Sequence, residues 1–136
     1  MTIREVQVTF DCAGPDALAD FWCAVLGYDK QPPPAGFDSW DAALDAWGVP
    51  AEDRDSRSAA VPPEGETGPR LFFQRVPEPK TAKNRVHLDL HVGEERIRPE
   101  VDRLVALGAV EGKEWREVGG HWIAMTDPEG NEVDVE

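Results

Sequence analysis

The sequence predicts an α+β fold built from two similar halves, and three observations support this prediction. Residues 6–11 and 85–92 both alternate polar and apolar side chains without a break, which is typical of strands buried on one face. An amphipathic helical pattern follows each stretch and ends at a Leu-Gly pair, at residues 26–27 and 107–108. Further strand patterns follow each helix, so the order strand, helix, strands occurs twice.

In the first half, the strand 6–11 places Gln7 on its polar face. The helix that follows begins at Pro15, which is favoured at the first helical position. A later strand, residues 70–76, carries Phe72 and Gln74 on the same face. Shorter strands are predicted at residues 28–31 and 58–61.

In the second half, the strand 85–92 places His87, Asp89 and His91 on one face and valine and leucine on the other. A polar face with two imidazoles around a carboxylate is typical of a pocket wall rather than of an ordinary solvent face. A helix over residues 93–107 follows this strand. The remaining strands are predicted at residues 110–117, 121–126 and 131–136, with a tight turn at 127–130.

The first half is longer by a segment at about residues 36–56, which reads as an insertion containing one more helix. Trp40 and Trp47 lie one heptad apart on that helix. On one interpretation they anchor the helix to the sheet. On the other they form a lid over an apolar pocket that Phe72 and Trp122 also line.

Composition narrows the possible partners and the compartment. The 136 residues carry a formal net charge of −13 without a basic cluster, which disfavours nucleic acid and anionic membrane surfaces. No segment approaches the roughly 20 apolar residues that span a bilayer, and the first five residues contain no apolar run typical of a secretory signal. The two cysteines lack a CxxC spacing, so we expect reduced thiols in a cytoplasmic protein.

Three motifs resemble the vicinal oxygen chelate superfamily, which includes glyoxalase I, extradiol dioxygenases and bleomycin-resistance proteins. Residues 20–28 (DFWCAVLGY) are similar to the signature of its first helix. Residues 76–80 (VPEPK) and 84–90 (NRVHLDL) resemble the glyoxalase-like domain branch. Residues 127–132 (DPEGNE) are similar to the final hairpin of the superfamily. The resemblance covers nearly the whole chain and is specific for fold rather than for function.

The resemblance implies a single glyoxalase-like domain over residues 1–136, in which two βαβββ modules form a curled mixed sheet around a cavity. Module one would span about residues 1–79, including the insertion at about 36–56, and module two about 80–136. Family members typically form homodimers, so the resemblance also implies a homodimer.

In metal-dependent members of the superfamily, four side chains at equivalent strand positions hold a divalent ion. Matched strand by strand, the resemblance assigns these positions to Gln7, Gln74, His87 and Asp134. Gln74 puts an amide where the family has a carboxylate, and a neutral amide is a poor ligand for a hard cation and cannot act as a base. The set is therefore incomplete. Both alternatives stay open: no cofactor, or a divalent metal such as Zn, Ni, Fe or Mn.

The histidines have alternative interpretations as well. His87 is either a metal ligand or a pocket histidine bonded to Asp89 or Asp134, and the missing carboxylate favours the second. His91 is expected at the pocket rim or facing solvent. His121 follows two glycines and is expected in a turn.

Three functions follow as hypotheses. The first is a small-molecule-binding protein of the glyoxalase/bleomycin-resistance type that sequesters a drug or metabolite, and the acidic composition suits a cationic ligand. The second is a divalent-metal-dependent lyase, isomerase or dioxygenase, in which the metal polarises vicinal oxygens and Asp134 moves the proton. The third is an interaction module with a vestigial cavity. The candidate ligand-binding residues are Gln7, Trp40, Trp47, Phe72, Gln74, His87, Asp89, His91 and Trp122.

Overall fold

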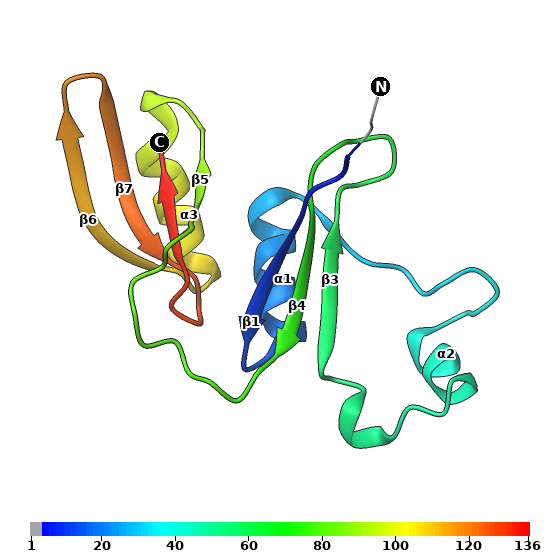
Figure 1. The fold of residues 1–136 in the computed structure, drawn as a ribbon. Coiled ribbons are helices and arrows are strands. Elements are labelled where there is room, and N and C mark those ends of the chain that lie inside the picture. The colour runs from blue at the N-terminus through cyan, green and yellow to red at the C-terminus, as the bar shows by residue number, and fades with distance from the viewer. Residues whose placement is uncertain (1–3) are drawn as a thin grey trace. The chain divides into compact units, whose positions relative to one another are not determined.

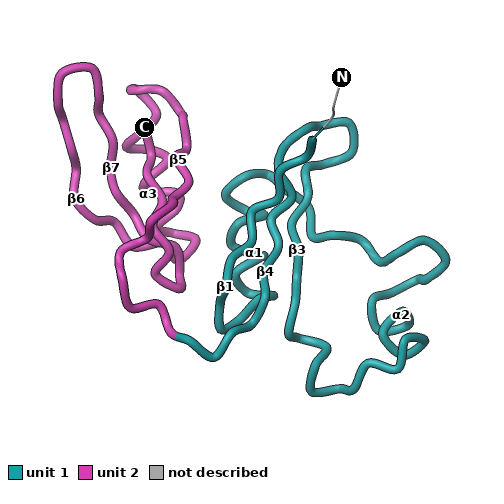
Figure 2. The backbone as a smooth tube through the Cα atoms, in the orientation of Figure 1, with its two compact units in different colours: residues 1–78 teal, residues 79–136 magenta. Residues whose placement is uncertain are grey.

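The computed structural model describes residues 4–136. Residues 1–3, on which part of the expectation about a secretory signal rests, lie outside the described residues. The chain divides into two compact units, residues 1–78 and 79–136 (Figure 2). Within the described part of the chain, no helix has the length and apolar character needed to cross a membrane.

Unit 1 is a four-stranded mixed sheet with a helix packed on it (Figure 1). The strand order is β1-β4-β3-β2, with β1 parallel to β4 and the other neighbours antiparallel. Two short helices lie between β2 and β3, in the predicted insertion. In chain order, the elements are β1 (Gln7–Cys12), α1 (Pro15–Leu26), β2 (Asp29–Lys30), α2 (Trp40–Ala46), η1 (Ala51–Asp53), β3 (Arg57–Val61) and β4 (Arg70–Arg75).

The core of unit 1 lies between α1 and the sheet. The helix begins at Pro15 and ends at Gly27, whose φ of 68° provides the left-handed cap that the sequence predicts. Trp22 is 1% exposed, and its ring lies 5.2 Å from that of Phe10, which in turn stacks on Phe73 at 5.1 Å. One face of the sheet is therefore occupied by the core, and its polar side chains are left on the opposite face.

Unit 2 has the same topology. Its strand order is β5-β8-β7-β6, with β5 parallel to β8 and antiparallel pairing elsewhere. The two predicted βαβββ modules are thereby confirmed. In chain order, the elements are β5 (Leu88–Leu90), η2 (Glu94–Arg96), α3 (Ile97–Leu107), β6 (Val110–Glu117), β7 (Gly120–Thr126) and β8 (Glu132–Val135).

The core of unit 2 is formed by the apolar stripe of α3 and the inward residues of β7 and β8. Val101 and Leu104 on the helix and Val133 and Val135 on β8 are fully buried. The tight turn between β7 and β8 is present as predicted. Asp127, only 1% exposed, accepts hydrogen bonds there from the backbone N–H groups of Glu129 and Asn131.

The strand predicted at residues 85–92 is shorter in the structure. Only Leu88–Leu90 pairs with β8, where the partners are Val133–Val135. Val86 has no ladder partner among the described residues and is 81% exposed, so it does not join the apolar face that alternation predicts. A strand extends only as far as its partner does, and the sequence pattern does not show where β8 ends.

Candidate functional site

A cavity of about 860 Å³ lies in unit 1 between the insertion and the sheet. Trp40 and Trp47 line it from α2 and its C-terminal cap, and Phe72 lines it from β4. These are three of the four aromatic residues that the sequence analysis places around a pocket. Along the chain, the lining combines the segments 30–31, 40–59 and 70–72 with Asp16 of α1.

Hydrogen bonds at both ends of α2 hold this short helix in place. Ser39 caps the N-terminus, since its hydroxyl accepts a hydrogen bond of 3.0 Å from the N–H of Ala42. Trp40 donates its indole N–H to the carbonyl of Gln31 at 2.9 Å. Beyond the C-terminus, Arg54 donates to the carbonyl of Val49 at 3.1 Å. The insertion is therefore tied to β2 and to its own return loop.

The aromatic side chains of the insertion form a cluster that remains partly open. Trp47 makes edge contacts with Trp40 and Phe37, at ring distances of 6.4 and 5.9 Å. Trp40 is 39% exposed and Trp47 is 56% exposed. The bond from Trp40 to the sheet supports the anchoring interpretation for this residue. The exposure of Trp47 instead favours the interpretation of this residue as part of a lid over the pocket.

Basic residues outnumber acidic residues in the lining of the cavity, although acidic residues outnumber basic ones in the whole chain. Four basic residues and two acidic residues line it, in a chain whose formal net charge is −13. The basic residues are Lys30, Arg54, Arg57 and Arg70, and the acidic residues are Asp16 and Asp53. The expectation of a cationic ligand, which rests on overall composition, therefore does not fit the local charge.

Arg70 on β4 is oriented by two neutral side chains. Its Nη1 donates to the amide oxygen of Gln7 at 2.7 Å, and its Nε donates to that of Gln31 at 2.6 Å. The guanidinium lies 5.1 Å from the centre of the Phe72 ring. Gln7 sits on β1 directly opposite Arg70, so strand register explains its contact. Gln7 thus acts on the cavity through Arg70.

The structure does not bring Gln7 and Gln74 together. Gln7 pairs in register with Arg70, whereas Gln74 pairs with Asp11, four residues further along β1. At about 3.3 Å per residue, this separates the two positions by about 13 Å. Gln74 donates its amide N–H to Asp11 at 2.7 Å and does not line the cavity within the described chain. Within unit 1 the two glutamines therefore have different surroundings.

In unit 2, His87, Asp89 and Asp134 form a compact cluster. The Nδ1 atom of His87 lies 2.7 Å from an Asp89 oxygen and 3.8 Å from an Asp134 oxygen. The three residues offer donor atoms that all lie within 4.8 Å of one another. Asp89 and Asp134 face each other because they are paired in the parallel β5/β8 register. His87 is thus bonded to Asp89, which agrees with its interpretation as a histidine paired with a neighbouring carboxylate.

Contacts around β8 fix this cluster. Glu132 accepts a hydrogen bond from the Lys83 side chain and another from the N–H of Asn84, each at 2.5 Å. The segment before His87 is thereby bound to the strand that carries Asp134. The same bonds make Glu132 more acidic, since the Lys83 ammonium group lowers the pKa of its carboxyl.

The chemistry of the cluster suits a divalent cation. Burial raises the pKa of Asp134, the charges of Asp89 and Glu136 raise it further, and His87 partly opposes this shift. A cation bound between the carboxylates would relieve that repulsion. One imidazole nitrogen with carboxylate oxygens is a donor set that Zn, Fe and Mn accept. Asp89, assigned to ligand binding by the sequence analysis, joins His87 and Asp134 here.

The other two predicted site residues lie elsewhere. The His91 side chain is 79% exposed, and its Nε2 lies 3.2 Å from a Glu136 oxygen, in agreement with the expected solvent-facing position. Trp122 belongs to β7 of unit 2, where its ring stacks on that of Trp115 at 6.1 Å. Trp122 is not among the described residues that line the cavity of unit 1.

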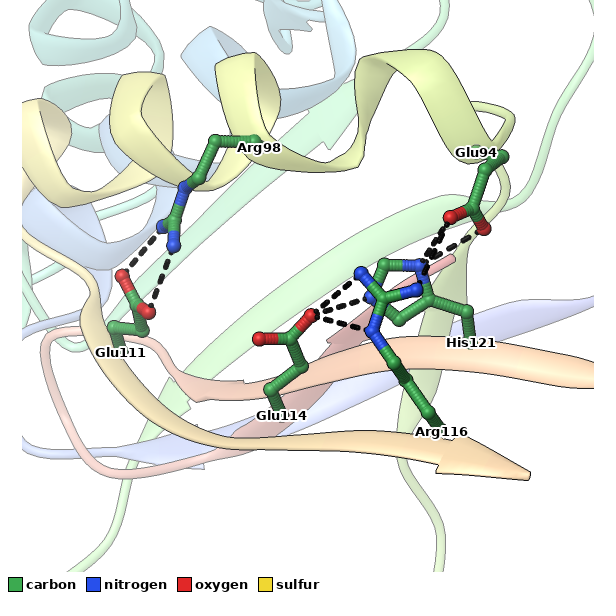
Figure 3. A network of polar contacts seen from close by, with 6 residues as sticks. All are labelled: Glu94, Arg98, Glu111, Glu114, Arg116 and His121. Atoms are coloured by element: carbon green, nitrogen blue, oxygen red, sulfur yellow. Dashed lines mark hydrogen bonds and ion pairs between the residues drawn. The ribbon is translucent and has the colours of Figure 1, made fainter.

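The interpretation of His121 as a turn residue is wrong, whereas the strand predicted at residues 121–126 does contain it. It lies on β7 opposite Arg116 of β6, and its ring is the centre of a polar network (Figure 3). Its Nδ1 lies 2.8 Å from Glu94 and its Nε2 lies 2.7 Å from Glu114. The hydrogen bonds that His121 donates to both carboxylates raise its pKa, and the bond from His121 lowers the pKa of Glu114.

Sequence reasoning missed this network and the role of Arg70. The signal for His121 was its place at the start of a strand facing Glu114 and Arg116, but a hairpin register is needed to see it. The signal for Arg70 was weaker, because only the fold brings Gln7 and Gln31 to it.

Solved structures with similar folds cover nearly the whole chain. A mutant of the fosfomycin resistance protein FosX from Listeria monocytogenes, complexed with Mn(II) and 1S,2S-dihydroxypropylphosphonic acid, matches with a TM-score of 0.66 at 12% identity, over 100% of this chain and 90% of that chain. A glyoxalase/bleomycin resistance protein/dioxygenase family enzyme from Burkholderia phytofirmans PsJN matches with a TM-score of 0.62 at 18% identity, over 95% and 94% of the two chains.

The bleomycin-binding protein of Streptomyces verticillus, complexed with copper(II)-bleomycin, matches with a TM-score of 0.56 at 13% identity, over 99% and 96% of the two chains. At these identities the similarities show the fold alone. No curated protein matches the chain. The model of the glyoxalase-like domain matches residues 7–136. With nearly the whole chain inside that match, the protein belongs to the glyoxalase-like domain family.

Proposed function

We propose that this protein binds a small organic molecule in the cavity of unit 1, beneath the insertion, without requiring a metal. The observation that supports this most strongly is the cavity itself. Its volume of about 860 Å³ falls among the volumes typical of ligand pockets, and its lining combines three aromatic rings with polar and charged side chains. A vestigial cavity, the third hypothesis, would be filled or collapsed.

The exposure of the lid supports the same proposal. An indole that served only to attach α2 would be covered by the sheet, as the ring of Trp22 is covered by the core. More than half of Trp47 is instead left in water. A ligand with an apolar surface would remove that area from water and gain about 25 cal/mol for each Å² buried. The structural relative from Streptomyces verticillus, complexed with copper(II)-bleomycin, is consistent with a binding role for this fold.

Fluorescence titration with the neutral dye Nile red tests the proposal. We expect saturable binding with enhanced emission, and a loss of affinity of about five-fold or more in Trp47→Ala, since a buried aromatic contact contributes about 1 kcal/mol or more. Trp115→Ala is the matched control, because Trp115 is a similarly exposed tryptophan in unit 2. Absence of saturable binding, or equal losses in both variants, would contradict the proposal.

A second candidate function is a divalent-metal-dependent lyase, isomerase or dioxygenase, and the cluster of His87, Asp89 and Asp134 favours it. These three side chains would hold the cation, which would polarise adjacent oxygens of a substrate. In this candidate function the carboxylate of Asp134 would also move the proton of the substrate. FosX, one of the structural relatives, is seen with Mn(II).

Thermal unfolding with added Mn²⁺, Fe²⁺, Ni²⁺ or Zn²⁺ tests this candidate. A cation present at 100 times its dissociation constant would stabilise the protein by about 2.7 kcal/mol. His87→Ala should abolish that gain, whereas His91→Ala should keep it, because His91 is exposed and lies outside the cluster. If no metal is retained under any loading condition, or if both variants respond alike, the metal-dependent activity is excluded.

We also propose that the protein is a cytoplasmic homodimer, as the family resemblance implies. Cys12 and Cys23 are not joined in a disulfide within the described residues, and reduced thiols suit a reducing compartment. Sedimentation equilibrium would give a mass of twice 15.0 kDa for the dimer. A mass of one chain at all concentrations would contradict it.

A further inference from the structure

We infer that the cavity of unit 1 selects organic anions: a flat apolar body lies against the insertion tryptophans, and a carboxylate binds the guanidinium of Arg70. This inference rests on the proposed function, because it names the ligand class of the same cavity. It runs against the composition of the chain, whose acidic excess would by itself favour cations.

The first support is the way Arg70 is held. Gln7 and Gln31 take up its Nη1 and Nε through amide oxygens, which orient the guanidinium without neutralising it. Within residues 4–136, Arg70 has no carboxylate within ion-pair distance, and its Nη2 makes no hydrogen bond. The guanidinium is therefore oriented, and three of its five N–H donors, two on Nη2 and one on Nη1, remain to bind the oxygens of a carboxylate.

The second support is that two other basic residues of the lining, Lys30 and Arg54, already have ion-pair partners. Lys30 forms ion pairs with Asp16 and Asp20, and Arg54 forms one with Asp45 at 2.5 Å. Partial burial lowers the pKa of Lys30, but its hydrogen bonds to the two aspartates outweigh this and raise it. These two cations are thus already neutralised by partners within unit 1.

Arg57 adds to the positive character that remains. Neither Arg57 nor Arg70 has an ion-pair partner among the described residues, so both charges are uncompensated at the cavity. Asp53 is the lining carboxylate that is likewise unpaired there. Lys30 and Arg54 are each paired with two aspartates, so the attraction for an anion does not come from a net positive charge of the surroundings. It comes from the two guanidinium groups of the lining that have no ion-pair partner among the described residues.

The third support is the apolar surface beside Arg70. Phe72 lies under the guanidinium, and Trp40 and Trp47 line the same cavity from the insertion. A ligand whose carboxylate reaches Arg70 can therefore place a ring against aromatic side chains. An inorganic anion would use only the charge, and a neutral hydrocarbon would use only the rings. The combination favours an aromatic carboxylate.

Isothermal titration with two probes of nearly equal shape tests the inference. 1-Naphthylacetate carries a carboxylate, and 1-naphthylacetamide carries a neutral amide in its place. In the unmodified protein we expect the carboxylate to bind about ten-fold more tightly, which is typical of one charge-assisted pair. In Arg70→Gln we expect that ratio to fall to about one, while the affinity for the amide changes little.

Two further variants separate charge from folding. Arg70→Lys keeps the charge and should retain part of the preference, although it loses the two-pronged geometry. Arg75→Gln removes a cation from the same strand that is paired with Asp55 at 2.8 Å outside the cavity lining, so its ratio should equal that of the unmodified protein. Because the ratio is first measured on the unmodified protein, a variant that fails to fold does not decide the test.

The outcomes separate the two proposals. If the amide binds as tightly as the carboxylate, or if Arg70→Gln and Arg75→Gln lower the ratio equally, the anion inference is wrong and the binding function stands. If neither naphthyl probe nor Nile red binds, the proposed function itself fails.

Discussion

The two units share one topology, yet they place different chemistry on their sheets. Both have a parallel outer pair, β1 with β4 and β5 with β8, and antiparallel strands beyond it. Unit 1 adds an insertion between its second and third strands and there has a cavity lined by tryptophans and basic side chains. Unit 2 joins the corresponding strands by a hairpin and has an imidazole between two carboxylates.

The difference shows that two units with the same topology can carry different side chains on the sheet face opposite the core. The core positions of the two units are similar, because each helix must bury its apolar stripe against a sheet. The polar faces carry no such constraint, so unit 1 has the proposed ligand cavity and unit 2 the proposed metal site. The organic ligand and the metal are therefore separate hypotheses, and each can be tested by variants in its own unit.

The largest expected effect is a loss of stability in unit 1, and it distinguishes a core tryptophan from a tryptophan that lines the cavity. Trp22→Ala should lower the free energy of unfolding by about 3–5 kcal/mol, because a fully buried tryptophan leaves a large void. Trp47→Ala should lower it by less than about 1 kcal/mol, because the side chain is already largely in water. Urea denaturation measures both. Similar losses in the two variants would make Trp47 a structural residue and weaken the case for a ligand lid.

A smaller effect is expected at the turn that sets β8 in unit 2. Asp127→Ala should cost about 2 kcal/mol, because two backbone N–H groups in a buried turn would lose their acceptor. Asp127→Asn keeps one acceptor oxygen and should lose less. Chemical denaturation of the pair gives the difference. If the alanine variant were as stable as the unmodified protein, the turn would not be what holds the strand of Asp134.

Substitution of Asp134 should stabilise the protein, in contrast to the two destabilising changes above. Its folded-state pKa is raised, so the folded protein holds its proton more tightly than the unfolded chain does. The stability contributed by protonation is lost as pH rises from about 4 through the folded pKa. Without metal, Asp134→Asn should therefore raise Tm at pH 7 by about 2 °C. Glu95→Gln, at an exposed acid of η2, controls for the change in net charge. An equal rise of Tm in both variants would show that the ionised carboxylate of Asp134 does not destabilise the folded protein more than another acidic residue does.

The smallest expected effect is the pH response of the His121 network, which shares no residue with either candidate site. The folded pKa of His121 is raised, so its stabilisation is complete below about pH 6.5 and is lost as pH rises through the folded value. Between pH 6 and 9, Tm should fall by about 1 °C more in the unmodified protein than in His121→Gln. Parallel pH profiles would show that the network contributes nothing to folding.

Sequence patterns were sufficient for the scaffold. Alternation identified β1 and the inward face of β8, and glycines 27 and 108 ended the two long helices as expected. The heptad spacing of Trp40 and Trp47 predicted the helix, and the lining of a cavity was one of the two interpretations of this pair. These features depend on local periodicity and capping, which are written directly in the sequence.

The site depended on register and on charges brought together by the fold. Placing Gln7 beside Arg70, rather than level with Gln74, requires the parallel pairing of β1 with β4. The cationic lining was hidden by an acidic composition, because a net charge does not show where the unpaired charges lie. His121 looked like a turn residue because neighbouring glycines indicate only that a turn is near.

The indole N–H signals of the five tryptophans test the central claim most directly, since each unit contains its own reporters. Assigned by single substitutions, they can be followed in ¹H–¹⁵N NMR spectra during titration with 1-naphthylacetate. We predict that the signals of Trp40 and Trp47 shift with saturation while those of Trp115 and Trp122 stay in place. Shifts confined to Trp115 and Trp122, or no saturable shift at all, would contradict a ligand site beneath the insertion.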